Sequence, residues 1–501
     1  MFAAINSAVL LGAQGHRVTV EAHIGMGIPG FTVVGLPDEA CRESRDRVRA
    51  ALLSSDLPWP NRRVTINLAG ASVRKGGASL DLAIAIALLV AQEEIATSVV
   101  GDLAFLAELG LDGSLRSTPG TAPLVASVSD KSVVVAAACA HEALIAAPVK
   151  VFGEKTLRDV VTCLRGQQQW SPATAADRGE QVESVPDLAD VCGQPWARRA
   201  LEVAAAGHHN LFLIGPPGAG KSMLARRLPG LLPRLGPNEA FEVAMVHSAA
   251  SQAGNVRTAS DVPPFRAPHH SASLAAIIGG GTTAMRPGEV SLASHGVLFL
   301  DELGEFPPSV LDALRQPLED GVVHVARARH SVTMPARFLL VAATNPCPCA
   351  NSAPGACTCT HADIRRYQRR FSGPFLDRFD LRVAVEAPSP STLVDTVRGE
   401  STVQVAARVE CARSLAVSRQ GRVNAQLSVD ELDVHAPLSS SARLVLMGEL
   451  EASRLTGRGY HRVRRVARTV ADLDGHDGEL TDDHVREALL MRVAPRNPLH
   501  A

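Results

Sequence analysis

The sequence feature that most constrains the fold is the glycine-rich stretch GPPGAGKS at residues 215–222. It matches the phosphate-loop pattern G-x-x-x-x-G-K-[ST] and lies between an expected buried strand, NLFLIG, and an expected helix. In such a loop the backbone N–H groups surround a β-phosphate, the lysine reaches the β- and γ-phosphates, and the hydroxyl binds magnesium. A tight turn with a chance lysine is the alternative, which the complete pattern in its required context disfavours. The expected nucleotide contacts are Gly215, Pro216, Pro217, Gly218, Ala219, Gly220, Lys221 and Ser222.

A second motif, GVLFLDELGEF at residues 296–306, ends an apolar strand in two carboxylates. Asp301 is expected to hold a magnesium ion together with Ser222, and Glu302 to orient and polarise the attacking water. An ordinary strand end can also carry two acidic residues. Beside a phosphate loop, however, the pair predicts ATP hydrolysis with ATP and Mg²⁺ as the bound cofactors.

Composition narrows the remaining possibilities. Lysine plus arginine (50) balance aspartate plus glutamate (51), so a nucleic-acid surface must come from local arginine clusters. The aromatic content of 4% argues against recognition by stacking bases on exposed rings. The start of the chain lacks the basic segment of a signal peptide, and the longest apolar run, from Leu80, is too short to span a membrane. A cytoplasmic location without a membrane partner is therefore expected.

The chain divides into regions by its strand and helix patterns, because 501 residues exceed what one core usually accommodates. Short strand-like runs alternate with helical stretches over residues 1–165, and a polar linker follows over 166–189. Residues 190–387 contain short, fully apolar strands separated by helices, which predicts a parallel sheet covered on both faces. Residues 388–501 read as helical and polar. The expected fold class is thus α/β and multidomain.

A phosphate loop followed by an Asp-Glu strand end is typical of the additional-strand ATPases. Residues 190–495 resemble the magnesium-chelatase-like branch of the AAA+ family, notably in PFRAPHHSASLAAIIGGGTTAMRPGEVSLASHGVLFLDEL. With residues 1–165 included, the whole chain is similar to the ComM/YifB group of bacterial competence-related ATPases. This resemblance implies a Lon-protease-like N-terminal domain, an AAA+ core and a C-terminal helical lid.

The same resemblance implies further site residues. Asn345, which ends VAATN, corresponds to sensor 1, a polar group that touches the γ-phosphate or the water. Arg378 in GPFLDRFDL corresponds to an arginine finger for the neighbouring subunit's site, although a surface salt bridge remains the alternative. Arg458 corresponds to sensor 2, with Arg462 as the alternative. A finger supplied in trans contributes on the order of 10³–10⁵ in rate, so a ring, expected to be a homo-hexamer, is implied.

Four of the nine cysteines crowd into CPCANSAPGACTC, directly after Asn345, as two C-x-C pairs separated by seven residues. Four thiolates satisfy a closed tetrahedral zinc site, although C-x-C is tighter than the usual spacing. A structural Zn²⁺ is favoured over a redox disulfide, inert thiols or an iron–sulfur cluster. Zinc contributes roughly 10–16 kcal/mol in small peptides, enough to order a loop with little apolar surface. The predicted ligands are Cys347, Cys349, Cys357 and Cys359.

The Lon-like resemblance of the first domain does not extend to catalysis. RKGGASLD places Ser79 where such proteases carry their nucleophile, but no lysine occurs between Lys75 and Lys131 to activate it. Protease activity is therefore excluded. The domain also carries arginines on CRESRDRVRAALL, which read either as a solvated helix surface or as contacts to a nucleic-acid backbone: Arg42, Arg45, Arg47 and Arg49.

A second candidate for DNA contact is GVVHVARARHSVTMPARF, which predicts a hairpin with Arg327 and Arg329 near its tip. A plain exposed turn is the alternative. Together with the family resemblance, these arginines favour an ATP-driven DNA helicase or translocase that promotes branch migration in recombination or transformation, with single-stranded or branched DNA as partner. The alternatives are a protein-remodelling or metal-chelatase motor and a non-motor scaffold. The complete set of catalytic residues disfavours the scaffold.

Overall fold

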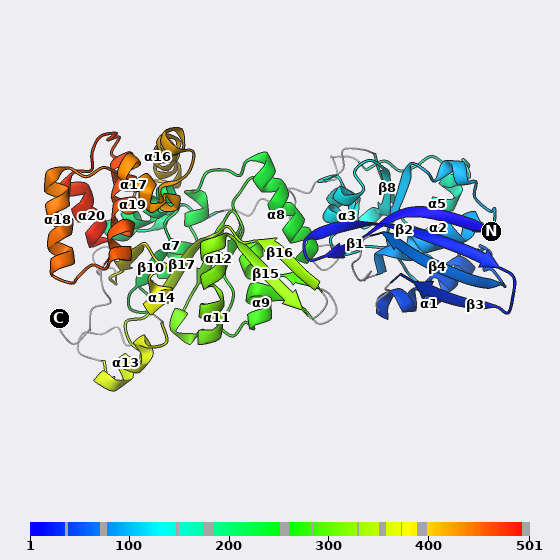
Figure 1. Ribbon diagram of the computed structural model, residues 1–501, viewed down its shortest axis with the longest axis horizontal. Helices are drawn as coiled ribbons and strands as arrows, with labels where there is room; N and C mark the ends of the chain where they lie inside the picture. The colour runs from blue at the N-terminus through cyan, green and yellow to red at the C-terminus, as the bar shows by residue number, and fades with distance from the viewer. Residues whose placement is uncertain are drawn as a thin grey trace.

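The computed structural model describes residues 1–35, 39–70, 78–146, 150–173, 185–250, 260–281, 285–327, 330–349, 357–371, 373–387 and 398–492. The described parts form three bodies in a row, with an N-terminal α/β body, a central α/β body and a C-terminal helical body (Figure 1). No helix within these ranges is both long and apolar enough to cross a bilayer.

The N-terminal body is built on a mixed seven-stranded sheet. Its strands, in spatial order, are β3 (Gly30–Val34), β4 (Arg63–Gly70), β2 (Gln14–Gly25), β1 (Phe2–Leu11), β5 (Leu103–Leu106), β8 (Ser132–Ala136) and β9 (Val151–Glu154). Helix α2 (Asp81–Ala91) packs on the inner strands, and every one of its residues is buried. An apolar sequence on all sides of a helix requires such burial. The apolar run from Leu80, too short to span a membrane, is therefore a buried helix of this body.

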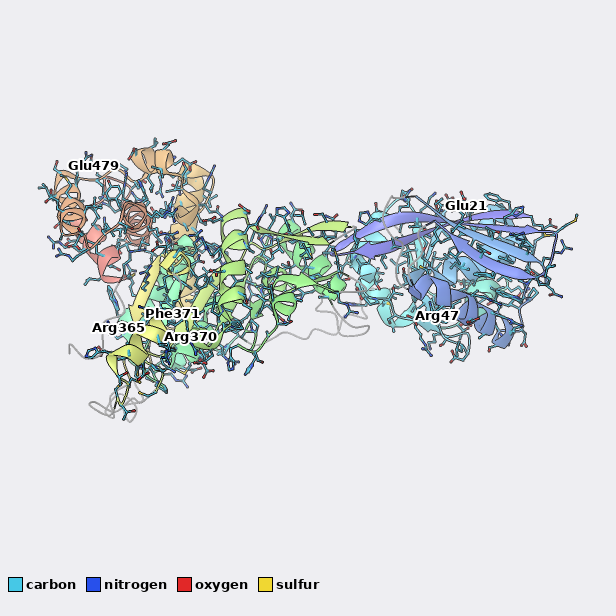
Figure 2. All side chains as sticks on the ribbon, turned by 60° about the horizontal axis from the view of Figure 1, so that its bottom comes forward. Glu21, Arg47, Arg365, Arg370, Phe371 and Glu479 are labelled. Atoms are coloured by element: carbon cyan, nitrogen blue, oxygen red, sulfur yellow. The ribbon has the colours of Figure 1, made fainter. Side chains whose placement is uncertain are left out.

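One arginine of helix α1 (Glu39–Ser54) turns inward. Figure 2 labels this residue, Arg47. The Arg47 Nε donates to Asp81 Oδ2 at 2.6 Å, and the Ser44 hydroxyl donates to Asp81 Oδ1 at 2.5 Å. Because Asp81 begins the buried helix α2, this pair anchors α1 to the core of the body. Arg45 and Arg49 remain exposed. Arg47 therefore belongs neither to a solvated helix surface nor to a nucleic-acid contact. It is a partly buried residue that anchors the helix.

The central body carries the predicted parallel sheet. Its five strands, all parallel, are β11 (Phe265–Arg266), β14 (Val297–Leu300), β17 (Leu339–Thr344), β10 (Leu211–Ile214) and β18 (Leu381–Ala384), in spatial order. Alternate residues of the inner strands enter two separate apolar cores: Leu211 and Leu213 pack with the helices of one face, and Phe212 with those of the other. Burial of both faces explains the continuous apolar runs in the sequence.

The C-terminal body is the predicted set of helices. They are α16 (Thr402–Gln420), α17 (Val429–His435), α18 (Ser440–Glu451), α19 (Gly457–Leu473) and α20 (Asp482–Leu490). Each begins after a serine or threonine whose side chain accepts a backbone N–H, which satisfies donors that a helix start leaves open. Helices α16 and α19 pack on α6 (Pro195–Gly207) of the central body.

Two contacts join the N-terminal and central bodies. Helix α3 (Thr121–Ser127) packs on α8 (Pro237–Ala250), where the Ser248 hydroxyl donates to the buried Glu142 carboxylate. The turn after β1 packs against the hairpin of β15 (Val322–Arg327) and β16 (His330–Pro335): a side chain on Gly12 would collide with Val332 (Figure 1). The predicted linker lies partly outside the described residues, and its first part packs on the N-terminal body through Trp170, stacked on Phe152.

Candidate nucleotide-binding site

The phosphate loop follows strand β10 and leads into helix α7 (Lys221–Ala225). Gly218 (φ +76°) and Gly220 (φ +87°) adopt left-handed backbone conformations that a side chain would disfavour. The Lys221 ammonium donates to the Gly215 and Pro216 carbonyls at 2.7 and 2.9 Å and to Asn345 Oδ1 at 3.2 Å. Burial lowers the pKa of Lys221, while Asp301 and Glu302 act in the opposite sense. The lysine is therefore held at the mouth of the loop by weak acceptors that a phosphate can replace.

The two carboxylates follow strand β14, beside the loop. The Ser222 hydroxyl donates to Asp301 Oδ2 at 2.6 Å, so these two oxygens already lie where both can bind one magnesium ion. Glu302 adopts a left-handed conformation (φ +51°), which costs a non-glycine residue free energy and is common at functional sites. Its backbone N–H donates to Asp301 Oδ1 at 3.0 Å.

A pocket of about 350 Å³ is lined by this loop and both carboxylates. Thr344 and Asn345, from the end of strand β17, complete its wall. Since the carboxyl ends of parallel strands meet at one edge of the sheet, the three motifs converge although they are distant in sequence. The predicted residues that the structure brings together here are Pro217, Gly218, Ala219, Gly220, Lys221, Ser222, Asp301, Glu302 and Asn345.

Two further residues, neither of them among the expected site residues, contact the walls of this pocket. His270 Nδ1 lies 3.2 Å from Glu302 Oε2, and its ring stacks on His269 with 4.0 Å between centroids. Gln194 Nε2 donates to the Ala219 and Glu386 carbonyls at 2.5 and 3.1 Å and so supports the phosphate loop. The only sequence signal for His270 is the histidine pair in PFRAPHH. That signal gives no spacing from which a contact with Glu302 follows.

Arg378 lies at the amino ends of the strands of the same sheet, whereas the pocket lies at their carboxyl ends. It precedes β18, which runs parallel to β10, whereas the phosphate loop follows the carboxyl end of β10. Its side chain donates to Glu319 and to the Pro374 carbonyl. Burial lowers the pKa of Arg378; Glu319 opposes this, and the nearby charges of Arg315, Arg462 and Arg458 lower it further. Arg378 therefore does not join the pocket of its own chain.

Both sensor 2 candidates lie on the Arg378 side. Arg462 forms an ion pair with Asp380, while Arg458 is exposed. Burial opposes ionisation of Asp380, but Arg462 and His209 outweigh it and lower the Asp380 pKa. Neither arginine lines the nucleotide pocket of the same chain.

Comparison with known proteins places this arrangement in a family. The family described as magnesium chelatase, subunit ChlI, matches residues 187–393; its C-terminal region matches 399–492, and a further ChlI family matches 20–138. Competence protein ComM of Haemophilus influenzae is 42% identical over 99% of this chain and 98% of its own length. The uncharacterized proteins YifB of Escherichia coli (42%, over 99% and 98%) and Rv2897c of Mycobacterium tuberculosis (44%, over 97% of each chain) are similar along nearly their whole lengths.

The chain belongs to the ComM/YifB family. It is accordingly a magnesium-chelatase-like AAA+ ATPase, as the parallel sheet and the pocket at its carboxyl edge also indicate. The predicted mixed α/β fold with a parallel core and a helical C-terminal region is confirmed. The Lon-like character of the N-terminal domain stays a prediction.

In this ComM/YifB-family chain the four clustered cysteines do meet. Their sulfur atoms all lie within 4.8 Å of one another. Burial, together with the neighbouring thiols of Cys349 and Cys357, raises the pKa of the Cys347 thiol to about 12. The sequence prediction of a four-sulfur cluster thus agrees with the geometry, while the metal itself stays a prediction.

The strands of the predicted hairpin and the serine considered as a nucleophile also lie within the described residues. Strands β15 and β16 form the expected hairpin, paired as far as Arg327 and His330; Arg329 lies outside the described residues. Ser79, the former nucleophile candidate, is buried, and its hydroxyl donates to the Ala8 carbonyl at 3.2 Å. Lys75 lies outside the described residues. Ser79 thus has a structural partner within the sheet of the N-terminal body.

Proposed function

We propose that this chain is a ring-forming ATP-driven motor that acts as a DNA helicase or translocase and promotes branch migration. One observation carries the motor part: the groups suited to ATP hydrolysis share one pocket, while Arg378 lies at the opposite sheet edge. A pocket without an arginine finger of its own gains one from the next subunit. The DNA part is supported by the competence protein ComM, which is 42% identical along the whole chain.

In the proposed hydrolysis, Lys221 exchanges its carbonyl acceptors for the β- and γ-phosphates. Ser222 and Asp301 would hold Mg²⁺, which would neutralise charge on the phosphates. Glu302 polarises the attacking water, and Asn345, already bonded to Lys221, contacts the γ-phosphate or that water. Arg378 of the adjacent subunit stabilises the charge that develops on the transferred phosphoryl group.

The proposed DNA-gripping element is the hairpin of β15 and β16. Its inner face is anchored by buried side chains, including Val323, Val325, Val332 and Met334. Arg327 is the last described residue of β15, and Arg329 follows it by two positions in the sequence. We propose that a ring presents this end of the hairpin to the DNA backbone. A homo-hexamer is the ring size that the family resemblance implies.

The test is steady-state ATPase activity of the purified chain with no DNA, single-stranded DNA or forked DNA, at two salt concentrations. We expect stimulation by DNA that weakens with salt, because arginine–phosphate contacts release counterions. Glu302→Gln is the inactive control. Arg327→Ala with Arg329→Ala should lose the stimulation and keep the basal rate. The exposed Arg443→Ala on α18 is the matched control, and should lose neither.

An ATPase rate that no DNA changes, at concentrations where a ring forms, would contradict the DNA proposal. The magnesium-chelatase families that match this chain would then favour a protein-remodelling or metal-chelatase type of motor.

A further inference from the structure

The cysteine cluster has the dimensions of a metal site. Cys347 and Cys349 have sulfur atoms 3.3 Å apart, and Cys357 Sγ lies 3.7 Å from each of them. Four thiolates bound tetrahedrally to zinc at about 2.3 Å are separated from one another by about 3.8 Å. A disulfide requires about 2.05 Å. The observed spacing therefore fits a tetrathiolate ion site and is too long for a sulfur–sulfur bond.

The ligand set also selects the kind of metal. Soft thiolates prefer zinc over magnesium or calcium, which take oxygen ligands. Four protein ligands leave no open position, so such a site is structural rather than catalytic. An iron–sulfur cluster needs room for several iron and sulfide atoms between the thiolates, which sulfur atoms within 4.8 Å of one another do not leave.

The site would fix the start of helix α13 (His361–Gln368). Cys359 directly precedes Thr360, whose hydroxyl accepts the Asp363 N–H, while Asp363 accepts from the Thr360 N–H in return. The other C-x-C pair begins two residues after Asn345. A metal ion there joins the end of strand β17 to the start of α13.

The end of α13 contacts both catalytic segments of the nucleotide pocket. The Tyr367 hydroxyl lies 2.8 Å from Thr344 Oγ1, which precedes Asn345, and the Tyr367 ring covers Gly304. Just beyond the helix lies Arg370, which Figure 2 labels. Its guanidinium donates to the Gly304 carbonyl at 2.6 Å and pairs with Glu305 at 3.2 Å. Gly304 follows Glu302 by two residues. One helix thus supports the two strand ends that carry Asn345 and Glu302.

We propose that Cys347, Cys349, Cys357 and Cys359 bind one structural zinc ion, and that this ion, through α13, positions Asn345 and Glu302 for hydrolysis. Among the described residues, no hydrogen bond or ion pair joins the phosphate loop, Ser222 or Asp301 to α13, so nucleotide affinity should depend little on the zinc. The kinetic part of this proposal rests on the proposed hydrolysis mechanism, whereas the metal content does not.

Metal content is measured first, by elemental analysis of the full-length chain purified under reducing conditions. We expect one zinc per chain in the wild type and in the controls Cys192→Ser and Cys411→Ser. The pair Cys357→Ser and Cys359→Ser should lose it. Replacement of the zinc by cobalt in the wild type should give thiolate-to-cobalt absorption bands, which tests the ligands even where the double variant does not fold.

Three results would overturn the metal site: no bound metal in the reduced wild type, iron with sulfide instead of zinc, or a loss of two mass units that shows a disulfide. Cobalt without thiolate bands would equally exclude the four sulfurs as ligands.

The positioning role is measured by kcat, the KM for ATP and the nucleotide affinity. Loss of zinc should lower kcat by about 10- to 100-fold, because a small misplacement of reacting groups is costly, with KM and nucleotide affinity nearly unchanged. Tyr367→Phe should keep the zinc and lower kcat in the same way, though less. A zinc-free chain with wild-type kcat would overturn the positioning role alone. A wild type that binds zinc and ATP but hydrolyses nothing would instead refute the proposed function.

Discussion

At the scale of single residues, the pocket is organised by side chains that already have partners. Lys221 is held by the loop carbonyls and Asn345, and the Ser222 hydroxyl by Asp301. These residues were predictable because strand, loop and helix signals adjoin them in the sequence. His270 was not, because its contact with Glu302 joins segments about thirty residues apart, and no local pattern encodes such a contact.

The His270 contact leads to a prediction about the basal rate. An imidazole beside Glu302 Oε2 competes for the carboxylate oxygen that must accept a proton from water. We expect His270→Ala to raise the DNA-independent kcat severalfold and to leave the KM for ATP unchanged. His269→Ala, which removes the stacked ring but not this contact, is the matched control. A fall in kcat for His270→Ala would show that the imidazole orients the base instead.

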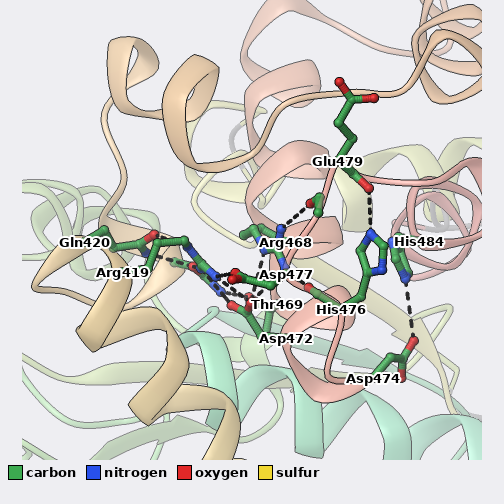
Figure 3. Close-up of polar contacts among 12 residues, drawn as sticks. Arg419, Gln420, Arg468, Thr469, Asp472, Asp474, His476, Asp477, Glu479 and His484 are labelled. Atoms are coloured by element: carbon green, nitrogen blue, oxygen red, sulfur yellow. Dashed lines mark hydrogen bonds and ion pairs between the residues drawn. The ribbon is translucent and has the colours of Figure 1, made fainter.

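At the scale of secondary-structure elements, helix α19 departs most from its sequence appearance. Two of its arginines, Arg458 and Arg462, are the sensor 2 candidates, whereas two others, Arg464 and Arg468, are buried. Arg468 Nε donates to Asp472 at 3.1 Å, Arg419 reaches the same carboxylate at 2.7 and 2.9 Å, and Asn424 at 2.7 Å (Figure 3). The helix period predicts which face of α19 is buried, but not that charged groups fill it, because Arg419 and Asn424, which complete the network, come from other segments of the chain.

This network leads to a prediction about stability. Asp472→Asn should lower the free energy of unfolding of the helical body by about 3–5 kcal/mol, because it leaves buried guanidinium groups without their counter-charge. Asp483→Asn on α20 is the exposed control and should change stability little. Urea unfolding, followed by circular dichroism, measures both. Equal stability of the two variants would mean that solvent reaches the Asp472 site.

At the scale of the whole molecule, the order of the three bodies and the parallel core were predictable from apolar patterns and motifs. The docking of the N-terminal body was not, because Gly12 against Val332 and Ser248 against Glu142 are contacts between surfaces that look ordinary in sequence. The place of Arg378 relative to the pocket likewise follows from the parallel direction of β18 and β10, which a motif does not state.

The position of Arg378 leads to a prediction about assemblies mixed from two variants. Arg378→Ala and Glu302→Gln chains should each be inactive alone. In an equal mixture, about one quarter of the sites would pair an intact Glu302 with a neighbour's intact Arg378, as a head-to-tail interface requires. We therefore expect about a quarter of wild-type ATPase activity from the mixture. Addition of a Glu302→Gln, Arg378→Ala double variant instead of the Glu302→Gln chain is the control and should restore nothing.

Because Arg378 and the nucleotide pocket lie on opposite sides of the subunit, the number of complete sites depends on assembly. Each subunit offers one half of two different sites, its own pocket on one side and Arg378 on the other. An open row of n subunits contains n − 1 complete sites, and the last site forms only when the row closes on itself. If Arg378 serves the neighbouring subunit as proposed, we expect turnover per chain to rise as subunits are added and the assembly closes, which ATPase rates over a dilution series would measure.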